Sequence, residues 1–206
     1  MDIPAGSNPY ENISIKSYKI VVIGDSGVGK TTLIKRMKDN EFHENIDSTI
    51  GAGSIKITYN HDCTSEVVFE FLDTAGQEQY RSLATFYIKN AVVGLICFNP
   101  NNDDWIDSII DWKGIVVNKE PNIHLIAVAT KYDLWKNSLN ISSIFSNVKK
   151  RCNISDIQYV SSLSGENVDD LLSEIDKKVN QTNLPESSHL ILQKDDYDDN
   201  KPKCKC

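Results

Sequence analysis

The segment GDSGVGKT, residues 24–31, constrains the fold more than any other feature of the chain. It matches the pattern GxxxxGK[ST] and follows Tyr18–Ile23, an apolar, β-branched run that predicts a buried strand. Apolar residues then recur at helical spacing, so the motif lies between a predicted strand and a predicted helix. Such a loop points successive backbone N–H groups at phosphate oxygens, and the helix start adds further unpaired donors. The segment therefore predicts a phosphate-binding site.

Two side chains of this motif add chemistry to the backbone. The ammonium of Lys30 supplies a positive charge for the outer phosphates, and the hydroxyl of Thr31 is a suitable ligand for Mg²⁺. The alternative is a glycine-rich turn with an accidental lysine, and the position between strand and helix argues against it. The residues expected to contact phosphate are Ser26, Gly27, Val28, Gly29, Lys30, Thr31 and Thr32.

Strand and helix patterns alternate along the rest of the chain. Further strands are predicted at 55–59, 67–72, 91–98, 124–129 and 157–161, and further helices at 103–119 and after Asn167. We expect the side chain of Asn167 to cap that last helix. The alternation predicts an α/β fold with a mainly parallel, six-stranded sheet and helices on both faces. The domain is expected at 18–183, between a flexible leader (1–17) and a polar, acidic, disordered tail (184–206).

Composition excludes several classes of function. The net charge of −7 argues against a nucleic-acid surface, which requires clustered lysine and arginine. No secretory signal opens the chain, and no apolar stretch approaches the roughly 20 residues that span a bilayer. The five cysteines do not follow a metal-binding spacing, and we expect Cys97, inside an apolar run, to be buried and reduced.

The stretch Thr130-Lys131-Tyr132-Asp133 follows directly on the predicted strand at 124–129. The carboxylate of Asp133 can accept hydrogen bonds from the N1–H and the 2-amino group of guanine, and adenine has neither donor. The aliphatic part of Lys131 can cover the purine ring. Alone, TKxD is a weak motif, but after a phosphate loop it indicates a guanine nucleotide site. Thr130, Lys131, Asp133 and Leu134 are the residues expected there.

With the stretch DTAGQE at residues 73–78, the set of motifs resembles the Ras-like small GTPases, and among them the Rab family. The resemblance covers residues 19–181 and implies a P-loop small G domain that binds GTP, GDP and Mg²⁺. It implies that Asp73 and Thr49 help Thr31 to hold Mg²⁺, and that Gly76 contacts the γ-phosphate. It implies that Gln77 orients the attacking water, with Lys30 as the second catalytic residue. Phe42, Ser162, Leu163 and Ser164 resemble the remaining guanine-contacting residues.

Several positions depart from the family pattern. Leu163 and Ser164 differ in the last base loop, and Thr130 replaces a commoner asparagine, so we expect an altered guanine affinity with specificity retained. The switch stretches 42–52 and 76–87 are similar to those of the early-endosomal Rab group. Ser54 and Leu72, however, replace two of the three aromatic residues that form an effector-facing patch in that group.

The chain ends in DDNKPKCKC. Unmodified thiols, a small metal clip or a disulfide are the plainer interpretations of Cys204 and Cys206. Rab proteins resemble this chain in a terminal Cys-x-Cys pair that carries two geranylgeranyl groups, and two lipids anchor a protein stably where one does not. This resemblance implies a monomer on the cytoplasmic face of intracellular membranes, such as endosomal ones, with a cytosolic pool. It also implies exchange factors, GTPase-activating proteins, effectors, and the prenylation and GDP-dissociation-inhibitor machinery as partners in vesicle trafficking.

Two other functions remain open from the sequence. The first is a binding module that senses the nucleotide without hydrolysing it. The second is a P-loop kinase for small molecules, although the sequence contains no recognisable acceptor site or lid arginine cluster for it.

Overall fold

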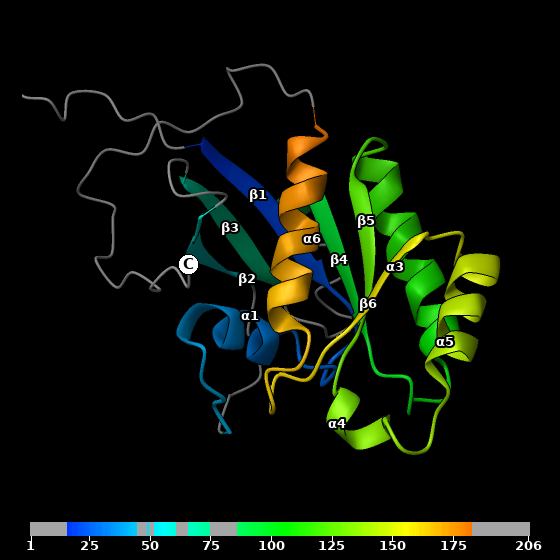
Figure 1. Ribbon diagram of the computed structural model, residues 1–206. Coiled ribbons are helices and arrows are strands. Elements are labelled where there is room, and N and C mark those ends of the chain that lie inside the picture. Colours follow the sequence, from blue (N-terminus) through cyan, green and yellow to red (C-terminus); the bar gives the residue numbers. More distant parts are fainter. Residues whose placement is uncertain (1–15, 45–48, 50–51, 61–65, 75–85, 183–206) are drawn as a thin grey trace, which may run out of the picture.

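The computed structural model describes residues 16–44, 49, 52–60, 66–74 and 86–182, and Figure 1 shows how its elements are arranged. In chain order they are β1 (Lys16–Ile23), α1 (Lys30–Asp39), β2 (Ala52–Asn60), β3 (Glu66–Thr74), β4 (Val93–Phe98), α3 (Trp105–Lys119), β5 (His124–Ala129), α4 (Tyr132–Trp135), α5 (Ile141–Asn147), the π-helical turn η2 (Val148–Cys152), β6 (Asp156–Tyr159) and α6 (Val168–Asn180).

The six strands form one sheet in the order β2-β3-β1-β4-β5-β6. All neighbouring strands are parallel except β2, which runs antiparallel to β3. Strands β1 and β4 are buried on both faces, as their continuous apolar sequences require in a sheet covered by helices. The predicted α/β class and the mainly parallel six-stranded sheet are therefore confirmed.

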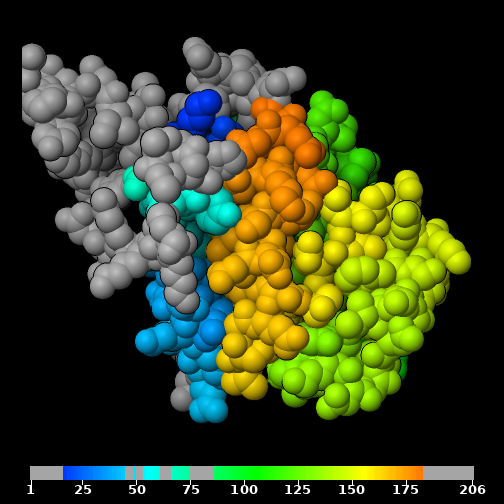
Figure 2. Space-filling model, viewed as in Figure 1, coloured from blue at the N-terminus to red at the C-terminus, as the bar shows by residue number. Residues whose placement is uncertain are grey.

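Two apolar cores lie on opposite faces of the sheet, because successive side chains of a strand point to opposite sides. Ile20 and Val22 of β1 join the core formed with α1 and α6, whereas Val21 and Ile23 join the core formed with α3, α5 and η2. Figure 2 shows α6, in orange, crossing the visible face beside α1. The carboxyl ends of β1, β3 and β5 all meet at one edge, which is where parallel sheets bind ligands.

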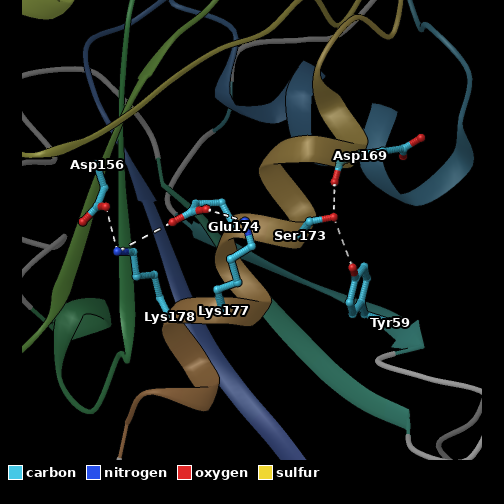
Figure 3. A network of polar contacts seen from close by, with 7 residues as sticks. All are labelled: Tyr59, Asp156, Asp169, Ser173, Glu174, Lys177 and Lys178. Atoms are coloured by element: carbon cyan, nitrogen blue, oxygen red, sulfur yellow. Dashed lines mark hydrogen bonds and ion pairs between the residues drawn. The ribbon is translucent and has the colours of Figure 1, made fainter.

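Helix α6 is tied to the strands at the two opposite edges of the sheet, β6 and β2 (Figure 3). Lys178 Nζ lies 2.7 Å from Asp156 Oδ1 of β6 and 3.6 Å from Glu174 Oε1 one turn earlier. In the middle of the helix, the hydroxyl of Ser173 lies 3.3 Å from the hydroxyl of Tyr59 on β2. These polar contacts supplement the apolar stripe of α6 and fix the last helix before the tail.

The element boundaries differ from the sequence prediction at a few points. β1 begins at Lys16, two residues earlier than predicted, and the short elements between 132 and 152 had no clear sequence signal. The predicted cap of α6 is wrong: Asn167 has φ 60° and makes no side-chain capping bond. A capping side chain needs an extended backbone to reach the first helical N–H groups. Asn140, with φ −93° and ψ 115°, meets this condition and accepts a bond from the Ser143 N–H at the start of α5.

Among the described helices, none combines the length and the apolar character that a membrane-spanning segment requires. Cys97, only 1% exposed, is a free thiol in the core of the sheet, as predicted. Its burial raises the pKa of the thiol to about 12, which keeps it protonated and inert at neutral pH.

Candidate nucleotide-binding site

The loop between β1 and α1 has a backbone that only glycine adopts easily at three positions. Gly24, Gly27 and Gly29 have φ of 140°, 74° and 100°. A Cβ on Gly24 would lie 2.1 Å from the carbonyl oxygen of Cys97 on β4, so the loop also packs directly against the neighbouring strand. Ser26 and Gly27, at the tip, are exposed. The structure therefore folds the predicted phosphate segment as a tight, open loop ahead of a helix of ten residues.

Lys30 curls back over this loop. Its side chain is buried at 6% exposure, and Nζ donates to the carbonyl oxygens of Gly24 and Asp25, each at 2.8 Å. Burial lowers the pKa of the ammonium, and the charges of Asp73 and Asp25 oppose that shift. The Lys30 ammonium is thus held against the backbone of the candidate phosphate loop.

Three predicted Mg²⁺ ligands come together beside the loop. The hydroxyl of Thr31 donates to Asp73 Oδ2 at 2.6 Å and lies 2.8 Å from the hydroxyl of Thr49, which is 3.3 Å from the same carboxylate oxygen. Asp73 is only 4% exposed, and its second oxygen, Oδ1, has no hydrogen-bond partner among the described residues. Desolvation raises the pKa of this carboxyl group.

This arrangement fits a divalent cation. Mg²⁺ prefers hard oxygen ligands, and one or two carboxylates with hydroxyls and water are typical of its sites. A buried carboxylate oxygen without a partner costs free energy, which a bound cation would recover. The donor set and the buried oxygen are therefore suited to Mg²⁺.

The Thr130 side chain joins the second predicted motif to the phosphate loop. Its hydroxyl donates to the Val28 carbonyl at 2.6 Å and lies 3.0 Å from the Phe98 carbonyl. The following residue, Lys131, has a left-handed backbone with φ 56°. Its Cε lies 3.8 Å from where a Cβ on Gly29 would be, so the lysine stem extends over the phosphate loop. Leu134, the next residue of this set, is 63% exposed.

The carboxylate of Asp133 is oriented by the loop that follows β6. Ser161 Oγ donates to Asp133 Oδ1 at 2.5 Å and accepts a bond from the Ser164 N–H at 3.1 Å. Ser161 directly precedes Ser162, Leu163 and Ser164, which the resemblance names as guanine-contacting residues, but it is not itself one of the predicted site residues. Ser162 is 9% exposed and Leu163 is 53% exposed, at the rim of the same loop.

Two buried tryptophans also contact the site, and sequence reasoning missed both. Trp135 Nε1 donates to the Thr130 carbonyl at 2.8 Å, and Trp112 Nε1 donates to Asp25 Oδ1 at 2.9 Å. Both side chains are fully buried. Helical spacing on 103–119 places Trp112 on an apolar face, but no local pattern indicates that its N–H reaches a loop 87 residues away.

The structure describes some of the remaining predicted residues and not others. Phe42 lies in the loop after α1 and is 37% exposed, and Thr32 is half-buried in α1. Gly76, Gln77, Cys204 and Cys206 lie outside the described residues, so their roles stay predictions.

Comparison with known proteins agrees with the geometry. The family described as Ras matches residues 19–181. A protein of Acanthamoeba polyphaga mimivirus described as a probable Rab-related GTPase is 28% identical over 177 residues, which cover 84% of this chain and 81% of that relative.

Proposed function

This chain belongs to the Ras family and is a GTP-hydrolysing enzyme, and we propose that it acts as a slow switch between GTP-bound and GDP-bound states. Members of this family bind GTP and GDP, generally with Mg²⁺. The observation that carries the proposal is the Thr130–Val28 hydrogen bond, which joins the candidate guanine motif to the candidate phosphate loop in one buried unit. A nucleotide spanning both motifs would contact a single rigid surface.

Guanine selection falls to Asp133. Ser161 occupies one carboxylate oxygen and fixes the orientation of the group, while the stem of Lys131 lies over the loop where the ring and sugar would pass. Guanine offers two donors to such a carboxylate. Adenine offers none there, and a polar group left unpaired on binding is the source of large selectivity.

Lys30 and the glycine-rich backbone would hold the phosphates. The Lys30 ammonium already lies against the loop carbonyls, so it needs only a small movement to reach an oxygen in front of them. Thr31, Thr49 and Asp73 would hold Mg²⁺, which supplies positive charge to the phosphate oxygens when bound. Gln77 is proposed to orient the attacking water.

The switch is proposed to depend on Thr49. Its hydroxyl reaches Thr31 and Asp73 and so connects the loop after α1 to the cation site. With Gly76, it would sense the γ-phosphate, and both contacts would be lost when phosphate leaves.

Intrinsic hydrolysis is expected to be slow. Of the described arginines, Arg36 contacts the Ser164 carbonyl and Arg151 lies 3.9 Å from Asp107, so neither is placed at the phosphate loop. A rate of about 10⁻⁴ to 10⁻³ s⁻¹ is typical of family members that lack a cis arginine, and a partner protein would supply the missing charge.

We also propose a membrane-anchored role in vesicle trafficking, on the cytoplasmic face of intracellular membranes. The support is the Cys204/Cys206 ending and the Rab-related relative. Mass measurement of the intact protein from its native cells should give two geranylgeranyl groups, and an unmodified C-terminus would overturn the anchoring proposal.

The partner surface is proposed to differ from that of the early-endosomal Rab group. The exposed Ser54 hydroxyl donates to Glu70 at 2.8 Å, so a polar pair occupies this part of the surface of β2 and β3. Leu72 is only 8% exposed and therefore offers little apolar surface to a partner. An aromatic contact with the effectors of that group would lose most of its apolar area here.

Phosphate release over several turnovers tests the hydrolase mechanism. The unchanged chain should release phosphate from GTP steadily, and Gln77→Leu should release it at least ten-fold more slowly while binding GTP equally well. Equal rates for the two proteins would remove the role given to Gln77 and favour a binding module. ATP turnover with a small acceptor would favour a kinase.

A further inference from the structure

Asp25, the second residue of the phosphate loop, accepts hydrogen bonds through both its backbone and its side chain. Its backbone carbonyl accepts a hydrogen bond from Lys30 Nζ at 2.8 Å. Its carboxylate accepts one from Trp112 Nε1 at 2.9 Å. Trp112 belongs to α3 and is completely buried in the core on that face of the sheet. The loop is thus attached to a helix far away in the sequence through a side chain that binds no phosphate itself.

A buried tryptophan is usually explained by packing, and its N–H needs some acceptor in any fold. Trp135 is the internal comparison: it is equally buried, and its N–H donates to a backbone carbonyl, that of Thr130. The partner of Trp112 is instead a carboxylate in a loop built to receive an anion. A hydrogen bond to a charged group is stronger than one between neutral groups, and here it also decides where a negative charge lies.

The position of that charge matters for a triphosphate. A carboxylate free to turn toward the loop opening would repel the phosphates, and it would compete with them for the Lys30 ammonium. The indole N–H retains the carboxylate on the α3 side of the loop, while the Asp25 carbonyl stays oriented for Lys30.

We propose that Trp112 is a positioning residue for nucleotide binding, which acts by holding the Asp25 carboxylate on α3 and away from the bound phosphates. This inference rests on the proposed nucleotide site. It assigns Trp112 an electrostatic role that a purely structural core residue would not have.

Double-mutant cycles on the full chain test this role, with the release rate of a fluorescent GDP and the unfolding temperature as readouts. Trp112→Phe keeps an aromatic ring but removes the N–H with the five-membered part of the indole, and it should speed GDP release about ten-fold. Asp25→Asn keeps the acceptor oxygen and removes the charge, and its own release rate is the reference for the second half of the cycle. In the Asp25→Asn background, Trp112→Phe should change release by less than about three-fold, because no charge is left to misplace.

Trp135→Phe is the matched control, since it removes an equally buried indole N–H. Its effect on release should be the same in both backgrounds. Two results would overturn the proposal: a Trp112→Phe protein that unfolds earlier but releases GDP at the normal rate, or one whose effect persists undiminished with Asp25→Asn.

Asp25→Glu keeps the experiment decisive if Trp112→Phe does not fold. The longer side chain keeps the charge but displaces it from the indole, so release should be faster than with Asp25→Asn. Equal release from the two Asp25 variants would contradict the proposal. Failure of the unchanged chain to bind GDP would instead refute the proposed function, which separates the two claims.

Discussion

Removal of the Thr130 hydroxyl should weaken nucleotide binding in a way that can be calculated from its contacts. Thr130 is 1% exposed, and its hydroxyl is 2.6 Å from the Val28 carbonyl of the phosphate loop. Thr130→Val has nearly the same shape but leaves that carbonyl without this donor. The Phe98 carbonyl still accepts from the Thr130 N–H at 2.9 Å, so only one buried acceptor is lost.

A buried acceptor left without its donor costs about 1–3 kcal/mol. If the joined loops are the binding-competent arrangement, that cost appears in nucleotide affinity as about a five-fold to 150-fold faster release of GDP. The assay is displacement of a fluorescent GDP by excess unlabelled GDP, with thermal unfolding measured in parallel. Thr130→Ser is the matched control, because it keeps the hydroxyl and should lie close to the unchanged chain. Equal release rates for the serine and valine variants would refute the reasoning.

Three other changes have definite expected outcomes. Gly24→Ala should destabilise the fold by roughly 3 kcal/mol or more, because its Cβ meets a carbonyl at 2.1 Å, whereas Gly114→Ala in α3 has open space and should stabilise by about 0.5–1 kcal/mol in the same denaturation assay. Partial burial lowers the pKa of Lys178, but the acidic partners on β6 and α6 raise it by a larger amount. The pKa of Lys178 is therefore raised overall. The stability from this ion pair is therefore present below the unfolded pKa and lost as pH rises through the folded one; Lys178→Met should cost about 1–2 kcal/mol at pH 7, and the loss should fade above pH ~10.5. Asp73→Asn should unfold no earlier than the unchanged chain without Mg²⁺ and nucleotide, yet lose the rise in unfolding temperature that Mg²⁺ with GDP gives; an intact rise would contradict the cation site.

The sequence predicted those parts of the site that depend on backbone geometry. A loop with three left-handed glycines before a helix has few sequence solutions, so its residues are recognisable without a structure. The approach of Asp73 to Thr31 also follows from the fold, since β1 and β3 are parallel neighbours and their carboxyl ends coincide.

Contacts that depend on a single side chain across the core could not be predicted. Ser161 reaches Asp133 because of how β6 is placed in the sheet, and Trp112 reaches Asp25 because of how α3 packs on the sheet. The sequence pattern identifies Trp112 as apolar and inward-facing but does not say which acceptor its N–H meets. The failed prediction at Asn167 has a local cause, a left-handed backbone that composition does not reveal.

Competition between nucleotides for the purified chain tests the central claim most directly: the loop at 24–31 binds the phosphates and Asp133 selects guanine. The account predicts that GTP binds at least about 10³-fold more tightly than ATP, and that Asp133→Asn shifts the preference toward XTP, whose 2-oxo group needs a donor. Binding of ATP as tight as that of GTP, or a variant with unchanged preference, would contradict it.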